Sequence, residues 1–198
     1  LTGDLPMNRS TIPTTTLILA ALAVCLSALP VSAQRSKKGV KVVIDDLSSR
    51  TPSGWQEVSK VRPPRYKHFI LPRAKGDKRD AELTLFYFNG GGGSAAANIA
   101  RWKTLFVPPE GKHIDDVTTI KRFKVSGVRL TTVDIRGTYL YRKRPSEPLK
   151  SAQRRPDHRM ITGLFETENG PYFFRLVGPE KTVARHAKKF TAWLKAFK

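Results

Sequence analysis

A glycine-rich loop between an expected strand and an expected helix is the segment of this sequence best suited to ligand binding. Residues 90–93 are four glycines that follow a run rich in aromatic and apolar side chains, and Ser94 precedes a helical pattern. Such a loop presents backbone N–H groups and the positive end of a helix, which together can hold a phosphate or carboxylate. The candidate ligand-binding residues are Gly91, Gly92, Gly93, Ser94, Asn98, Arg101 and Trp102.

Ser94 also resembles the nucleophile of a strand-to-helix elbow. A serine hydrolase would need an acid and a histidine downstream, and Asp134 with His158 or His186 occurs in that order. An ordinary helix N-cap explains the same serine, because a serine side chain accepts a hydrogen bond from an exposed N–H group of the first turn. We therefore assign no catalytic residue and keep a small secreted serine hydrolase as the alternative function.

The histidines give little support for a metal centre. His113 with Asp115 and Asp116 is the local cluster that most resembles a ligand set, and a solvated loop explains that cluster equally well. We assign neither a metal nor a cofactor.

The most basic stretch is residues 142–159, where seven lysines and arginines face Glu147 and Asp157. Three prolines interrupt it, which indicates a long loop, and a flexible connection between two strands is the alternative to a binding role. The stretch lacks the interleaved aromatic residues that stack on bases, so sequence-specific nucleic-acid binding is not expected. The candidate anion-binding residues are Arg142, Lys143, Arg144, Arg154, Arg155 and Arg159.

The whole chain is strongly basic, with 36 Lys+Arg against 16 Asp+Glu and a formal net charge of +20. Such a charge attracts polyanions at long range in a salt-dependent way, and says nothing about the fold. The expected partners are anionic lipid, acidic polysaccharide or an envelope protein.

The N-terminal part has the pattern of a cleavable export signal. An apolar run of about 13 residues follows Met7 and Arg9, too short to be a transmembrane anchor, and small residues precede a cleavage site between Ala33 and Gln34. Residues 1–33 are therefore interpreted as an upstream extension and signal peptide. This predicts a periplasmic or extracellular protein, and removing the leader would also remove Cys25, the only cysteine.

Residues 34–50 are expected to form a basic linker or edge segment, and residues 51–198 one domain. Within that domain a helix is predicted from Ser94 to about Phe106, and a second over residues 180–197. The order of strands and helices predicts an α+β fold, with an antiparallel sheet of about six strands packed against two main helices. The predicted strands cover residues 40–44, 66–71, 81–88, 117–125, 129–141, 160–168 and 171–177.

Several phrases of the sequence resemble a family of exported bacterial proteins without assigned activity. They include Phe69-Ile70-Leu71-Pro72, Gly91-Gly92-Gly93-Ser94, Asn98-Ile99, Arg101-Trp102 and Gly170-Pro171-Tyr172-Phe173-Phe174. The order of elements is also similar to the PsbP-like fold, an antiparallel sheet between helices. The resemblance implies a non-enzymatic binding or accessory domain and supplies no catalytic residues. We therefore expect an exported binding domain that contacts anionic envelope material through a basic surface.

Overall fold

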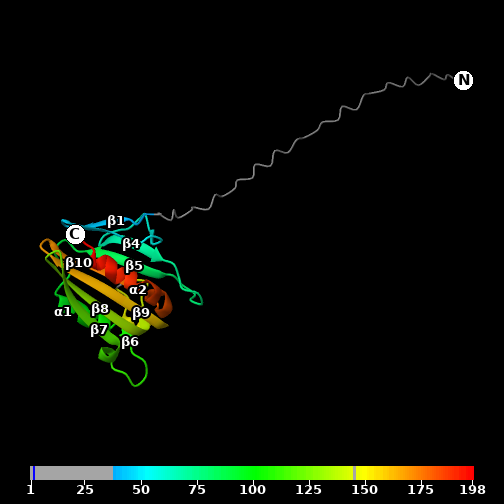
Figure 1. The fold of residues 1–198 in the computed structure, drawn as a ribbon. Coiled ribbons are helices and arrows are strands. Elements are labelled where there is room, and N and C mark those ends of the chain that lie inside the picture. The colour runs from blue at the N-terminus through cyan, green and yellow to red at the C-terminus, as the bar shows by residue number, and fades with distance from the viewer. Residues whose placement is uncertain (1, 3–37, 145) are drawn as a thin grey trace. The chain divides into compact units, whose positions relative to one another are not determined.

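The computed structural model describes residue 2 and residues 38–144 and 146–198 (Figure 1). The predicted upstream extension, signal peptide and cleavage site, and linker residues 34–37, lie outside the described residues apart from Thr2. Among the described helices, none has the length and apolar character needed to cross a bilayer.

The described chain is built on one antiparallel sheet of eight strands. Its order is β3-β4-β5-β10-β9-β8-β6, and β7 also pairs with β8. The strands are β3 (Gln56–Glu57), β4 (Arg65–Leu71), β5 (Ala81–Tyr87), β6 (Phe106–Val107), β7 (Thr118–Val125), β8 (Val128–Tyr141), β9 (Gln153–Thr167) and β10 (Gly170–Pro179). The helices are α1 (Ala95–Lys103) and α2 (Glu180–Lys195), with short 3-10 turns at η1 (Ile114–Val117) and η2 (Leu149–Ser151). The predicted α+β fold is confirmed.

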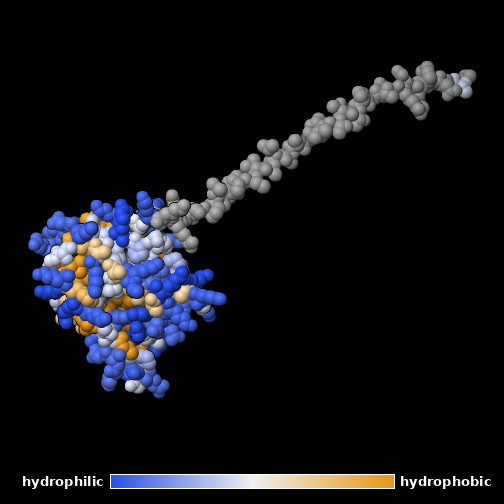
Figure 2. Space-filling view, in the orientation of Figure 1, coloured by the Kyte–Doolittle hydropathy of each residue, from blue (hydrophilic) through white to orange (hydrophobic). Residues whose placement is uncertain are grey.

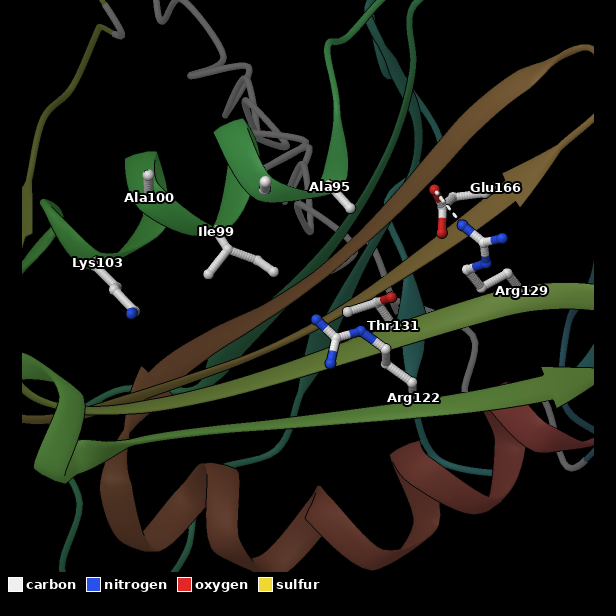
Figure 3. Close-up of a pocket in the computed structure, with 9 residues that line it drawn as sticks. Ala95, Ile99, Ala100, Lys103, Arg122, Arg129, Thr131 and Glu166 are labelled. Carbon is white, nitrogen blue, oxygen red and sulfur yellow. Dashed lines mark ion pairs between the residues drawn. The ribbon is translucent and has the colours of Figure 1, made fainter.

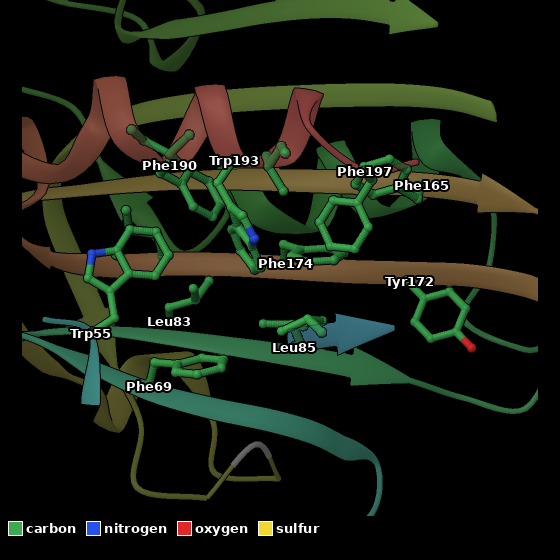
Figure 4. Close-up of a cluster of buried hydrophobic side chains, with 14 of the residues drawn as sticks. Trp55, Phe69, Leu83, Leu85, Phe165, Tyr172, Phe174, Phe190, Trp193 and Phe197 are labelled. Atoms are coloured by element: carbon green, nitrogen blue, oxygen red, sulfur yellow. The ribbon is translucent and has the colours of Figure 1, made fainter. Parts of the chain in front are cut away.

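The two helices cover opposite faces of the sheet. Successive residues of a strand point to opposite faces, so the packing of two neighbouring residues shows which helix covers which face. On β10, Phe174 packs in the core beneath α2, whereas Phe173 packs with α1. Figure 4 shows Phe190, Trp193 and Phe197 of the C-terminal segment over Phe174. The apolar stripe predicted for the C-terminal helix is thus its packing face, and the expected sandwich of a sheet between helices is confirmed.

The first helix is shorter than predicted. It begins after Ser94 as expected but ends at Lys103, because Phe106 and Val107 pair with Tyr139 and Thr138 of β8. Phe106 is still buried in the same cluster as Ile99 of the helix. The helical spacing therefore predicted correctly that these apolar residues share one core, but not that all of them lie on the helix.

The predicted basic loop is also shorter than expected, because β9 begins at Gln153 and not near Met160. Pro156 made a strand unexpected, since proline cannot donate to a ladder. In the structure, Pro156 and Asp157 lie at a bulge opposite Thr138, and Asp157 has a φ of 51°. Proline is tolerated at bulges, so the strand continues past it.

Residues 41–50 form a separate two-stranded hairpin, β1 (Lys41–Ile44) and β2 (Leu47–Arg50). Val42 and Ile44 are fully buried in the core that also holds α2. Ser48 exchanges backbone hydrogen bonds with Lys198. Of the segment interpreted as a linker or edge, the described part therefore packs on the domain.

The hairpin predicted at Gly127 is present between β7 and β8. Ser126 and Gly127 have φ values of 46° and 86°. Two positive φ angles in succession are what a tight type I′ turn requires. The register from Val125↔Val128 to Thr118↔Ile135 follows from this turn.

Asp77, in the loop between β4 and β5, caps the first turn of α2 from outside the helix. Its Oδ2 accepts hydrogen bonds from the Thr182 backbone N at 2.8 Å and from Thr182 Oγ1 at 2.6 Å. Asp77→Ala is therefore expected to lower the free energy of unfolding by about 1–2 kcal/mol, as the loss of an N-cap does. Urea denaturation measures this, with Asp46→Ala as an exposed control of equal charge change; equal values for the two variants would contradict the capping role.

Candidate functional site

Helix α1 covers only part of its face of the sheet. It has nine residues, and Ile99 and Trp102 pack with Val133, Leu164 and Phe173. Farther along the same face the alternate positions of the strands become polar. Thr84 of β5 and Arg175 of β10 lie between residues that point into the core beneath α2, so their own side chains point to the α1 side.

This uncovered part of the sheet holds a cavity of about 660 Å³, which we call the basic pocket. Side chains of β4, β5, β10, β9 and β8 line it, together with neighbouring loops. Among the described residues that line it, eight lysines and arginines face two carboxylates, Asp80 and Glu82. The cations are Arg65, Arg73, Lys78, Arg79, Arg142, Lys143, Arg155 and Arg175.

Two of these arginines are positioned by aromatic rings. The Arg155 guanidinium carbon lies 3.4 Å from the centroid of the Tyr141 ring, and that of Arg175 lies 5.1 Å from the Phe86 ring. The buried Nε of Arg175 has no hydrogen-bond partner among the described residues. Nε and Nη2 of Arg155 also donate to Gln153 Oε1, at 3.2 and 3.1 Å. An arginine fixed in this way presents its charge in one orientation, which suits charge-assisted binding of an oxyanion.

Glu82 is one of the two carboxylates that line the basic pocket. Its Oε2 lies 3.4 Å from His68 Nε2. The neighbouring His68 lowers the pKa of Glu82, burial opposes this, and the charges of Arg175 and Arg155 lower it further. Glu82 is therefore an ionised acceptor beside the many donors of the pocket.

His158, on the pocket wall, is buried and its Nδ1 lies 2.7 Å from the carbonyl oxygen of Pro156. Burial lowers its pKa from 6.5, the contact with Pro156 opposes this, and the charges of Arg155 and Arg79 lower the pKa further. His158 is therefore neutral at neutral pH and adds no charge to the pocket.

His158 and His186 together predict a loss of stability in mild acid. Burial lowers the pKa of both, so below about pH 6.5 the unfolded chain binds protons that the folded chain does not. Their contribution is present above about pH 6.5 and is lost as pH falls through the lowered folded-state pKa. Urea denaturation between about pH 7 and pH 5 should show this decline, and His158→Gln/His186→Gln should flatten it. An unchanged slope in the double variant would contradict the assignment.

The six sequence-predicted cations separate into three groups. Arg142, Lys143 and Arg155 line the basic pocket, whereas Arg144 and Arg154 are exposed outside its lining. Arg159 is held by Asp134 through hydrogen bonds of 2.8 and 2.5 Å. That pair raises the pKa of Arg159, although burial opposes the shift.

Sequence reasoning missed five of the pocket cations. They come from β4, from the charged loop that follows it and from β10, and the sequence did not show that these segments line the same pocket as residues 142–155. They are Arg65, Arg73, Lys78, Arg79 and Arg175.

The glycine loop is organised by Asn98. The buried Asn98 amide donates to the carbonyl oxygens of Gly92 and Ser94, at 2.7 and 2.9 Å, and its own oxygen accepts a hydrogen bond from Arg101. Trp102 is buried edge-on against Phe173. Asn98 and Trp102 therefore have contacts within the protein that account for their presence.

Within this loop Gly91, Gly92 and Gly93 are exposed. A Cβ atom at Gly92 would lie 2.8 Å from the Phe173 ring, and the φ of Gly92 is 115°, so glycine is required there for packing. Ligand binding by the loop stays a prediction.

The groups that a serine hydrolase would need are engaged elsewhere. Ser94 Oγ accepts a hydrogen bond from the Ala97 backbone N at 3.2 Å, as an N-cap does, and Asp134 pairs with Arg159. His186 Nε2 contacts the Pro72 carbonyl oxygen at 2.9 Å on the α2 side of the sheet. The geometry explains Ser94 as a cap.

A second pocket, of about 510 Å³, lies between α1 and the sheet (Figure 3). Arg129 pairs there with Glu166 at 3.6 Å, and Lys103 pairs with Asp115. These ion pairs offset part of its positive charge, so the basic pocket is the better candidate site. Within the described residues no three His, Cys, Asp or Glu side chains come together as metal ligands.

Comparison with known proteins finds solved structures of similar fold. No family model matches the sequence, and no curated protein matches it. The solution structure of the cyanobacterial PsbP (CyanoP) from Synechocystis sp. PCC 6803 is similar with a TM-score of 0.47 at 12% identity, over 87% of this chain and 98% of that one. PA94, a protein of unknown function from Pseudomonas aeruginosa, is similar with a TM-score of 0.41 at 12% identity, over 80% and 94% of the two chains. A shared fold does not imply a shared ligand.

Proposed function

We propose that this chain is a non-enzymatic binding domain that holds an anionic ligand in the basic pocket. The observation that carries the proposal is the concentration of eight cations against two carboxylates in one concave part of the sheet. Arg175 supports it further, because its buried Nε has no partner among the described residues. A buried donor without a partner costs free energy that a bound oxyanion would recover.

The expected site of action is the cell envelope, as the leader pattern indicates. Figure 2 shows hydrophilic side chains over most of the visible surface of the described residues, so the molecule presents charge broadly. The net charge of +20 speeds the encounter with polyanions, while the basic pocket gives a place where the ligand is held. Anionic lipid and acidic polysaccharide are the candidate ligands.

Retention on heparin and on vesicles tests this function. Residues 34–198 should bind heparin and vesicles of anionic lipid at low salt, and binding should weaken steeply as salt screens the charges. Vesicles of zwitterionic lipid are the control and should not bind. Absence of binding at low salt, or binding that does not change with salt, would contradict the proposal.

A further inference from the structure

The lining of the basic pocket crosses five strands of the sheet. It includes Ile70, Thr84, Arg175, His158 and Tyr141, one residue from each of five strands that are consecutive in the sheet. Because neighbouring strands lie about 4.8 Å apart, the pocket extends about 19 Å across them. A single phosphate or carboxylate would occupy only a fraction of that length.

Positive charge is distributed along the pocket. Arg65 lies on β4 at one end, and Lys143 follows β8 at the other. Arg175 and Arg155 lie between them, on β10 and β9. This distribution suits a ligand that carries its negative charges at intervals along a chain.

Two features of the pocket distinguish between the linear polyanions that could bind there. The Tyr141 and Phe86 rings already carry the guanidinium groups of Arg155 and Arg175, so a nucleic-acid base could stack on them only by displacing an arginine. Glu82, ionised and exposed, lies on β5, the second of the five strands that line the pocket. A carboxylate there repels any anionic group, but a sugar chain also carries hydroxyl groups that donate hydrogen bonds to it, whereas a polyphosphate chain has none.

From the length of the pocket, its charge distribution and the position of Glu82, we infer that the ligand is a linear acidic polysaccharide that crosses the five strands. Carboxylate or sulfate groups on its sugar rings bind the arginines, and a ring hydroxyl donates to Glu82. The inference rests on the proposed function and narrows it to one class of ligand.

Oligosaccharides of increasing length test the crossing geometry. Calorimetric titration of residues 34–198 with heparin fragments, from disaccharide to octasaccharide, should show affinity rising with length and levelling off once the pocket is spanned. Oligogalacturonides, which carry carboxylates alone, distinguish carboxylate from sulfate recognition. Equal affinity for the shortest and longest fragments, per mole of fragment, would overturn the inference.

Glu82→Ala tests the ligand class, with Glu110→Ala as an exposed control of equal charge change. The measured quantity is the ratio of affinities for a heparin fragment and for polyphosphate of matched charge. Glu82→Ala removes both the acceptor for a sugar hydroxyl and the repulsion of phosphate. It should therefore lower this ratio roughly tenfold, whereas the control variant should leave the ratio unchanged.

Different results would contradict the polysaccharide ligand and the anion-binding function. An unchanged ratio in Glu82→Ala, or equally tight pocket binding of single-stranded DNA or polyphosphate, would overturn the polysaccharide assignment and leave anion binding in the pocket intact. Failure of every polyanion to bind would overturn both.

Discussion

Arg65→Glu/Arg79→Glu is expected to weaken heparin binding roughly 100-fold at low salt, because two charge-assisted contacts of about 1.5 kcal/mol each are lost. Both side chains are exposed and both line the basic pocket, so the fold should tolerate the change while the ligand site does not. Calorimetric titration measures the affinity, and urea denaturation confirms that each variant is folded.

The matched control is Lys188→Glu/Lys189→Glu, on the exposed side of α2, across the sheet from the basic pocket. It changes the net charge by the same amount. If long-range attraction alone governed binding, the two double variants would lose affinity equally, and that result would contradict a defined site. A much smaller loss in the control, removed by moderate salt, agrees with the proposed function.

Phe174→Ala is expected to destabilise the fold by about 3–5 kcal/mol, as truncation of a buried aromatic residue does. Phe174 is fully buried, and its ring centroid lies 5.4–5.7 Å from those of Phe165, Trp193 and Phe197. It joins the sheet to the C-terminal segment, so the cavity left behind would open between two elements.

Urea denaturation measures this loss, with Phe88→Ala as the control. Phe88 is 38% exposed at the end of β5, and its truncation should cost about 1 kcal/mol or less. Equal destabilisation by the two variants would mean that the Phe174 cluster is not the centre of the core.

Periodicity and turn residues were sufficient to predict most of the fold. The apolar spacing of the last helix predicted its packing face, and Gly127 predicted a hairpin turn, since both signals are local. The same signals failed where tertiary pairing decided the outcome. The Leu105 carbonyl oxygen accepts a hydrogen bond from the Leu140 backbone N–H, so the chain after α1 is extended. A bulge allows β9 to continue through Pro156.

The candidate site was less predictable than the fold. A basic run drew attention to residues 142–159, and three of its cations do line the basic pocket. Arg175, however, is a single cation within an apolar strand, and its role depends on the strands that β10 pairs with. Residues that meet only across a sheet leave no local pattern.

The most direct test of the central claim is to map the bound ligand by NMR. Isotope-labelled residues 34–198 would be titrated with a heparin tetrasaccharide while amide chemical shifts are followed. If the ligand lies in the basic pocket, the largest shifts are expected on Glu82, Thr84 and Arg175 and on the residues around Arg79. Shifts concentrated instead on residues 90–94 or on the exposed side of α2 would contradict the central claim.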